Sequence, residues 1–186
     1  MSWTAVLPFR GGEERKTRLA GHMSATERRA LSDHMLQHAA RVLHGIPAIE
    51  RLVLLSGSAP DYWQGDVVTD EGRGLNAEIA AFADTIESGG LVVLLPDLPL
   101  LTRDDIEAVL TAAKDGCAIG PDRHGTGTNA LALCEPSGFA FGFGVGSFAR
   151  HQAAAPDAAI VRRAGLGLDC DEPDDLAAAA ELGFKP

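Results

Sequence analysis

The sequence predicts an α/β protein in which a mostly parallel sheet carries helices on both faces. Apolar, strand-like runs alternate along the chain with segments that have a helical period. Two of these runs, residues 52–55 and 91–95, are apolar throughout, which is typical of central parallel strands. We expect one domain over residues 1–186, because a chain of 186 residues can bury a single hydrophobic core.

The first half of the chain begins with a strand at residues 3–7. Ser24 and Glu27 have the spacing of a capping box, which predicts that the first helix begins there. That helix carries an apolar face made of Leu31, Met35, Leu36, Ala39, Val42 and Leu43. Residues 52–55 form the second strand.

The same alternation continues in the second half. A second helix follows Gly74 and is expected to run to the glycine pair at residues 89–90. After the strand at residues 91–95, Thr102 and Asp105 cap a third helix. Further strands are expected near Ala118, over 130–133 and over 166–171, with a last helix after Pro173. The glycine-rich segment 125–146 is the main irregular region.

The net charge of −10 argues against nonspecific binding to nucleic acid or to anionic membranes. No apolar run approaches the roughly 20 residues that a membrane-spanning helix needs. The first seven residues are too short for a signal sequence and lack a basic flank, so they are better interpreted as a buried strand. We therefore expect a cytoplasmic protein with no nucleic-acid or membrane partner.

A local cluster of cations follows the first strand. Four of the 16 basic residues, Arg10, Arg15, Lys16 and Arg18, lie close together beside the glycine pair at residues 11–12. Glycine amides can donate to phosphate oxygens and the cations can neutralise their charge, so the segment suits a triphosphate. It has no Walker A or GxGxxG pattern, and a solvated surface loop is the alternative.

Carboxylates lie at the carboxyl ends of two of the predicted strands. Asp97 stands where the strand at residues 91–95 opens towards the ligand-binding edge of a parallel sheet, and two prolines stiffen the chain around it. Asp169 and Asp171, two positions apart on the predicted strand 166–171, are expected to project from the same face. Such oxygen ligands suit Mg²⁺ bound together with substrate phosphates. Alternatively, Asp171 and Glu172 belong to the first turn of the last helix.

Three glycine-containing segments offer free amides and hydroxyls. Residues 70–76 lead into the second helix and can place backbone amides against a base or a phosphate. Residues 127–131 and 143–148 can bind a small anion in the same way.

Taken together, the motifs resemble a known family. They are KTRL at 16–19, GRGLN at 72–76, PDLPL at 96–100, GTNAL at 127–131, GVGSF at 144–148 with Arg150 and His151, and LDCD at 168–171. Their order and spacing, from Val6 to Leu176, are similar to those of the guanylyltransferase family of coenzyme F420 biosynthesis, which acts on 2-phospho-L-lactate or phosphoenolpyruvate. The resemblance implies a nucleotidylyltransferase domain with a Rossmann-like fold of the nucleotide-diphospho-sugar transferase type.

The resemblance also implies roles for individual residues. Asp97, Asp169 and Asp171 would hold Mg²⁺, and Lys16 and Asp97 would be catalytic. The nucleotide-binding residues would be Pro8, Arg10, Lys16, Arg18, Gly74, Leu75 and Asn76. The residues that bind the phospho-acid would be Thr128, Gly144 and Ser147.

The implied partners are GTP and a phosphorylated three-carbon acid, with a handoff of the product to a downstream phosphotransferase. Phosphoenolpyruvate is favoured over 2-phospho-L-lactate and 3-phospho-D-glycerate, because a composition rich in alanine and arginine indicates a bacterium of high GC content. One alternative is a molybdopterin or sugar-phosphate nucleotidylyltransferase, although residues 8–19 lack the glycine-rich LAGGxSxRMG-like loop of the molybdopterin enzymes. Another is a non-catalytic nucleotide-binding module.

Overall fold

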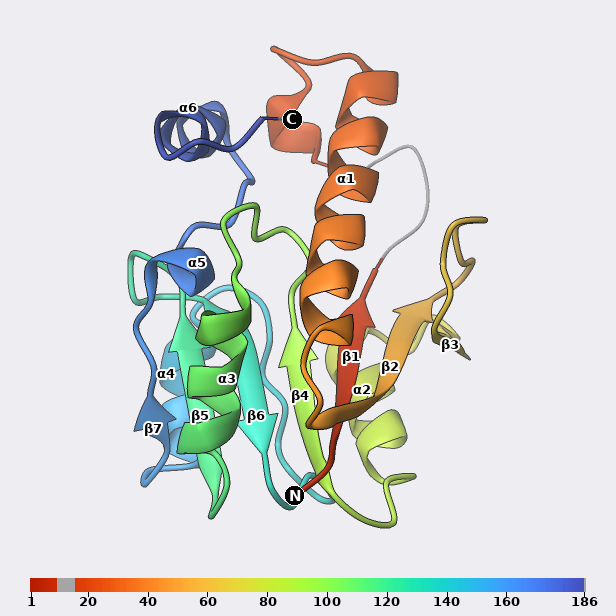
Figure 1. Ribbon diagram of the computed structural model, residues 1–186, viewed down its shortest axis with the longest axis vertical. Coiled ribbons are helices and arrows are strands. Elements are labelled where there is room, and N and C mark those ends of the chain that lie inside the picture. The colour runs from red at the N-terminus through yellow and green to blue at the C-terminus, as the bar shows by residue number, and fades with distance from the viewer. Residues whose placement is uncertain (10–15, 186) are drawn as a thin grey trace.

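The computed structural model describes residues 1–9 and 16–185, and within them seven strands form one sheet (Figure 1). The strand order is β3-β2-β1-β4-β6-β5-β7. The strands are β1 Trp3–Pro8, β2 Ile49–Ser56, β3 Asp66–Thr69, β4 Gly90–Leu94, β5 Cys117–Pro121, β6 Thr128–Leu133 and β7 Ala159–Ile160. This arrangement confirms the predicted α/β class.

The sheet is mostly parallel, and β6 is the antiparallel strand among those described. β1 pairs in parallel with β2 and β4, and β2 pairs in parallel with β3, whereas β6 runs antiparallel to β4 and β5. Because β6 runs in the opposite direction, its first residues, Thr128 and Asn129, lie beside the carboxyl end of β4. The amide of Leu95 donates to Asn129 O at 2.9 Å, which ties the two segments together at that end.

Helices cover both faces of the sheet (Figure 1). The helices are η1 Thr17–Leu19, α1 Ala25–His44, α2 Leu75–Ala83, α3 Arg103–Ala112, α4 Ser147–Ala154, α5 Ala164–Gly167 and α6 Pro173–Glu181. α1 and α3 pack on one face and α2 and α4 on the other, each through its buried apolar residues. No helix in the described part of the chain is long and apolar enough to cross a membrane.

A third apolar cluster lies beyond the sheet and holds the segments that carry several charged residues. It joins Leu19 of η1, Leu31 and Met35 of α1, Cys170, and Ala179 of α6. Leu19 is fully buried, and burying such a side chain contributes about 1.5–3 kcal/mol. The cluster therefore fixes residues 16–19 and 168–175 against the same end of α1.

Both predicted capping boxes are present. Ser24 caps α1 with Glu27, and Thr102 caps α3 with Asp105, with the reciprocal hydrogen bonds of that motif. Of the predicted apolar face of α1, every member is buried except Val42, which is half-buried.

The predicted strand at residues 166–171 is wrong. Residues 164–167 form the short helix α5, and residues 168–171 follow without strand structure, held by one backbone bond from Cys170 N to Asp97 O at 3.1 Å. α5 packs tightly, because a Cβ atom added at Gly165 would collide with Leu100 O and the side chain of Asp105. Close packing of this glycine, which local sequence does not reveal, favours the helical turn.

Two other predictions of local structure need correction. α2 ends at Ala83 rather than at the glycine pair 89–90, because the chain leaves the helix in turns in which Thr85 N and Ile86 N bond to Phe82 O and Ala83 O. The glycine-rich region 125–146 is followed by α4, a helix that was not predicted from the sequence. Strands β3 and β7, at the two edges of the sheet, were not predicted either.

Candidate functional site

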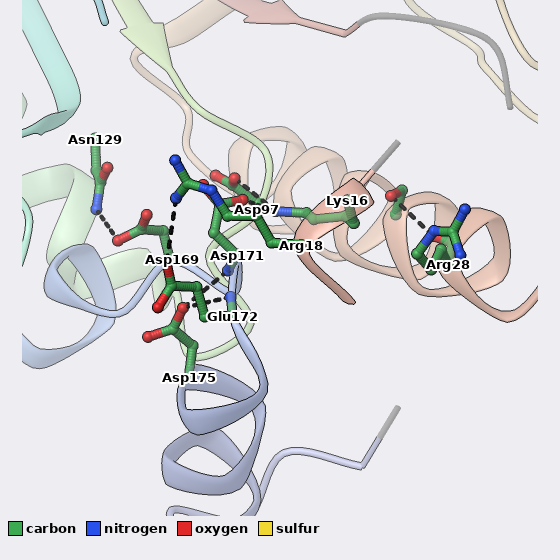
Figure 2. Close-up of polar contacts among 10 residues, drawn as sticks. Lys16, Arg18, Arg28, Asp97, Asn129, Asp169, Asp171, Glu172 and Asp175 are labelled. Atoms are coloured by element: carbon green, nitrogen blue, oxygen red, sulfur yellow. Dashed lines mark hydrogen bonds and ion pairs between the residues drawn. The ribbon is translucent and has the colours of Figure 1, made fainter. Parts of the chain in front are cut away.

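The ammonium group of Lys16 lies between two aspartates from distant parts of the chain (Figure 2). Its Nζ donates to Asp97 Oδ2 and to Asp171 Oδ1, both at 2.8 Å. The Lys16 side chain is 10% exposed, compared with 21% for Asp97 and 44% for Asp171. Burial lowers the pKa of Lys16, but the two carboxylates outweigh it and raise the pKa above its usual value. Lys16 is therefore a permanently charged cation at this edge of the sheet.

A third carboxylate, that of Asp169, lies near Asp97 and Asp171. Asp169 Oδ1 accepts a hydrogen bond of 3.3 Å from Asn129 Nδ2, which also donates to Leu166 O at 2.8 Å. Burial raises the pKa of Asp169, and the nearby charge of Asp97 raises it further. Asp97 Oδ1 is buried and has no hydrogen-bond partner among the described residues. The carboxylates of Asp97 and Asp169 thus repel each other, and Asp97 Oδ1 accepts no hydrogen bond from the described residues.

The chemistry of Asp97 fits a hard divalent cation, because its buried Oδ1 is a carboxylate oxygen to which no described residue donates. In the described part of the chain, no group of three or more His, Cys, Asp or Glu side chains is arranged to hold a metal ion. Magnesium usually binds through one or two carboxylates together with substrate phosphates, so the two observations agree. A magnesium site on Asp97, Asp169 and Asp171 stays a prediction.

The first turn of α6 fixes the backbone of Asp171. Asp175 Oδ2 accepts from the amides of Asp171 at 3.0 Å and Glu172 at 2.7 Å, and Arg123 holds Asp175 Oδ1 at 2.6 Å. Glu172 is the N-cap of α6, which agrees with the interpretation that it belongs to the helix rather than to a ligand site. Asp171, one residue earlier, points instead to Lys16 (Figure 2).

One predicted nucleotide-binding residue, Arg18, contacts the first turn of α6 beside this group, and another, Arg10, lies outside the described residues. Pro8 ends β1 and is half-buried. Arg18 is exposed, with Nη1 3.4 Å from Glu172 Oε1, so its guanidinium is accessible to a ligand. Arg10 belongs to the segment 10–15 that the structure does not describe.

The segment that leads into α2 is shaped by a buried glutamate. Glu78 accepts hydrogen bonds from the amides of Glu71 and Arg73, and it pairs with the Arg73 guanidinium at 2.6 Å. Gly74 has φ 96, a conformation that favours glycine, and provides no side-chain cap. The first-turn amides of α2 therefore receive no side-chain cap from this residue, and the nucleotide contacts of Gly74 and Leu75 stay predictions.

The side chain of Asn76 joins the α2 segment to the glycine-rich region. Its Nδ2 donates to Phe143 O at 3.1 Å, and its Oδ1 accepts from Phe143 N at 2.7 Å. Phe143 adjoins Gly144, a predicted acid-binding residue. The amide of Asn76 thus connects the predicted nucleotide and acid segments, and its nucleotide contact stays a prediction.

A β-bulge directs two neighbouring side chains to opposite faces of the sheet. Gly120 pairs with Ala130, whereas Pro121 pairs with Thr128, which leaves Asn129 as the extra residue. Strict alternation would place Thr128 on the face of Ala130, which packs with α1 and α3. Instead, Thr128 contacts His151 of α4 on the other face, while Asn129 contacts Leu166 and Asp169.

The three predicted acid-binding residues gather around the start of α4. Ser147, which is 2% exposed, is its first residue, and its amide donates to Gly144 O at 3.0 Å. Gly144 has φ 112. Thr128 is 2% exposed, and its Oγ1 lies 2.9 Å from Nδ1 of His151, one turn along the same helix. The structure thus brings Thr128, Gly144 and Ser147 together, although no ligand tests their role.

The free energy of unfolding is expected to fall as the pH drops from 6.5 to about 4. The reason is that burial, and to a lesser extent the charge of Arg150, lowers the pKa of His151 from 6.5 to about 4 in the folded protein. The unfolded chain binds a proton on this ring below 6.5, whereas the folded protein does so only near 4, so acid favours unfolding. One such group contributes a slope of up to about 1.4 kcal/mol per pH unit. Denaturant unfolding of the wild type and of His151→Gln across this range measures the difference, since other titrating groups are shared. Equal slopes would contradict the expectation.

Three residues that shape the site were not predicted from the sequence. Glu78 is a single acidic residue within a helix, and Asn129 is an amide within an apolar strand. His151 stands in the matched motif, but nothing in its spacing indicates a partner in β6. A polar residue at an otherwise apolar position was the available signal for Asn129 and Glu78.

The chain is similar in sequence to proteins of a known enzyme family. A family model described as guanylyl transferase CofC like matches residues 3–178. The chain is 35% identical to a phosphoenolpyruvate guanylyltransferase of Sphaerobacter thermophilus, over 95% of this chain and 91% of the relative. It is 31% identical to a 2-phospho-L-lactate guanylyltransferase of Methanopyrus kandleri, over 97% of this chain and 92% of the relative.

Solved structures with the same fold are more distant in sequence. A nucleotidyl transferase from Methanothermobacter superposes with a TM-score of 0.68 at 11% identity, covering 97% of both chains. The 2-C-methyl-D-erythritol 4-phosphate cytidylyltransferase of Thermus thermophilus gives 0.63 at 17% identity, covering 98% of both chains. These similarities confirm the predicted Rossmann-like nucleotidyltransferase fold. With the family model covering almost the whole chain, the protein is a nucleotidyltransferase that belongs to the CofC-like guanylyl transferase family.

Proposed function

We propose that the protein transfers GMP from GTP to a phosphorylated three-carbon acid, preferably phosphoenolpyruvate, and releases pyrophosphate in the biosynthesis of coenzyme F420. Several relatives that cover nearly the whole chain are phosphoenolpyruvate guanylyltransferases, and another acts on 2-phospho-L-lactate. The choice of phosphoenolpyruvate follows the more similar of these relatives.

The observation that supports this reaction best is the charge arrangement around Lys16. A buried ammonium group is held by Asp97 and Asp171, beside Asp169 and beside Asp97 Oδ1, which has no partner in the described part of the chain. Such a site neutralises phosphate charge with a fixed cation, and its carboxylates suit Mg²⁺ that arrives with a nucleotide. Bound Mg²⁺ would neutralise charge on the nucleotide phosphates, held by Asp97, Asp169 and Asp171.

The reaction requires positioning and neutralisation more than proton transfer. One oxygen of the acid's phosphate attacks the α-phosphorus of GTP, a new P–O bond forms, and the bond to the bridging oxygen breaks. That oxygen keeps the electron pair and leaves with pyrophosphate. Since the attacking oxygen is already anionic, no general base is needed. Lys16 stabilises the negative charge that develops on the leaving group.

The two substrates would be bound by different segments at the carboxyl end of the parallel strands. The first-turn amides of α2 at Gly74–Asn76 and the cations near β1 would hold GTP. Thr128, Gly144 and Ser147 at the start of α4 would hold the acid. A handoff of the product to a downstream phosphotransferase and a cytoplasmic location remain predictions.

The deciding experiment is Mg²⁺-dependent pyrophosphate release, measured with each of four nucleoside triphosphates against phosphoenolpyruvate, 2-phospho-L-lactate and 3-phospho-D-glycerate. The measurement is repeated with the downstream phosphotransferase, which would remove the product as it forms. Turnover with GTP and phosphoenolpyruvate is the expected result. Turnover with CTP would overturn the assignment of the base. GTP binding without turnover in any combination would favour a non-catalytic nucleotide-binding module.

A further inference from the structure

Both ring nitrogens of His151 are engaged in hydrogen bonds inside the protein. The side chain is fully buried, with Nε2 3.0 Å from the amide nitrogen of Gly142 and Nδ1 2.9 Å from Thr128 Oγ1. The ring of Phe143 packs edge-on against it, with centroids 4.7 Å apart. A histidine with two short polar contacts and no exposure has a fixed orientation.

These contacts determine which ring nitrogen carries the proton. A backbone amide can only donate, so the N–H of Gly142 makes Nε2 an acceptor. Burial and the charge of Arg150 lower the pKa of His151 to about 4, so the ring is neutral near neutral pH. A neutral imidazole with an accepting Nε2 carries its hydrogen on Nδ1. Nδ1–H therefore donates to Thr128 Oγ1.

The orientation of the Thr128 hydroxyl follows from this tautomer. Its oxygen accepts from His151, so its own hydrogen is directed elsewhere. Among the described residues, Thr128 Oγ1 has no other hydrogen-bond partner, although the residue is only 2% exposed. A buried hydroxyl hydrogen without an acceptor is costly, which indicates that a ligand oxygen accepts it in the working enzyme.

We propose that His151 is a positioning residue for the phospho-acid, which holds the Thr128 hydroxyl as a hydrogen-bond donor to an anionic oxygen of that substrate. This inference rests on the proposed function and names a determinant of the acid half of the site. His151 itself does not touch the acid. It acts through Thr128 on one side and through the Gly142 amide on the other.

The same ring also fixes the loop that carries Gly144. Arg150 Nε donates to Gly142 O at 2.9 Å, and Asn76 bonds both the amide and the carbonyl of Phe143. Gly142 and Phe143 are thus held from α2 and from α4 at once. His151 sets the distance between this loop and Thr128, the two parts of the site that would hold the acid.

Two substitutions separate the two bonds of the ring. The amide nitrogen of Asn can replace Nδ1, and the amide oxygen of Gln can replace Nε2. His151→Asn should keep the donor to Thr128, with the KM for the acid within about threefold of the wild-type value. His151→Gln should keep the Gly142 bond but lose that donor. Its KM for the acid should rise about 10–100-fold, and its KM for GTP should change less than about threefold.

Two further variants test whether the effect passes through Thr128. Thr128→Val should raise the KM for the acid as much as His151→Gln, and the double variant should add little, because both remove the same donor. Phe139→Leu is the control for packing, since its ring lies 6.3 Å from the His151 ring without a polar bond. It should lower stability and leave the KM for the acid unchanged. An equal rise in both KM values in His151→Gln, or additive effects, would overturn the proposal.

A spectroscopic measurement is independent of turnover. ¹⁵N NMR of the histidine rings should show the Nδ1–H tautomer for His151, and Thr128→Val should shift that signal. An Nε2–H tautomer would overturn the proposal even if the enzyme is active. If the predicted tautomer is found but no acid is turned over, the proposed function fails, and binding of the three acids measured by calorimetry then decides the role of His151. No difference in binding between the wild type and Thr128→Val would refute it.

Discussion

Replacing Asp97 with Asn is expected to abolish turnover, with kcat/KM reduced by at least about 10³-fold and the fold intact. The substitution keeps the shape of the side chain but removes the negative charge that Lys16 contacts at 2.8 Å. It also introduces an amide where the buried Oδ1, to which none of residues 1–9 and 16–185 donates, now offers an acceptor. Pyrophosphate release measures the activity, and circular dichroism with thermal unfolding measures the fold.

The matched control for this variant is Asp174→Asn. Asp174 is exposed in the first turn of α6, so the same chemical change occurs away from the Lys16 ammonium group. Its turnover should stay within about twofold of the wild-type value, because surface substitutions of this kind have small effects. Full activity in Asp97→Asn would remove this carboxylate from both the metal site and the catalytic machinery.

Replacing Lys16 with Met should lower kcat about 10²–10³-fold and also reduce stability. The side chain keeps its length but loses the charge that lies between Asp97 and Asp171. The charge of Asp97 already raises the pKa of Asp169, so these carboxylates repel each other. Removing the Lys16 cation would leave that repulsion uncompensated. The free energy of unfolding should fall by about 1–3 kcal/mol. Denaturant unfolding without divalent ions measures the stability, and single-turnover kinetics measure the chemical step.

Two other lysine variants show whether the charge or its geometry matters. Lys114→Met removes an exposed lysine whose side chain is 68% accessible, and it should leave both quantities unchanged. Lys16→Arg keeps the charge but replaces a compact ammonium with a planar fork, and it should recover stability more than turnover. If Lys16→Met keeps wild-type kcat and only loses stability, Lys16 holds the site together without taking part in the reaction.

Much of the architecture followed from local signals in the sequence. The apolar runs at 52–55 and 91–95 lie in β2 and β4, which both run parallel to β1, because a strand that is buried on both faces is apolar throughout. The capping boxes at Ser24 and Thr102 start α1 and α3 where predicted, since they depend on contacts three residues apart. Asp97 was predicted from a local signal as well, because it is a polar residue that follows a buried strand.

Other features depended on contacts between distant segments. The expected strand at 166–171 is the short helix α5 and an irregular segment, because Gly165 packs against Leu100 and Asp105. The sequence cannot show this, since the contact partners lie about 60 residues earlier. α4 was missed for a related reason. Its first residues follow glycines, and its buried Ser147 and His151 are polar, so its apolar periodicity is weak.

The sequence by itself determined the fold class, the main strands and helices, and the types of residue that a nucleotidyl transfer site requires. Only the tertiary structure decided how those residues meet. Lys16 reaches Asp97 and Asp171 across 81 and 155 positions, and a bulge at Asn129 sends Thr128 towards His151. The physical reason is that hydrogen bonds within a helix or a cap span three or four residues, whereas ion pairs and bulges depend on strand order and register. Those are set by the packing of the whole sheet.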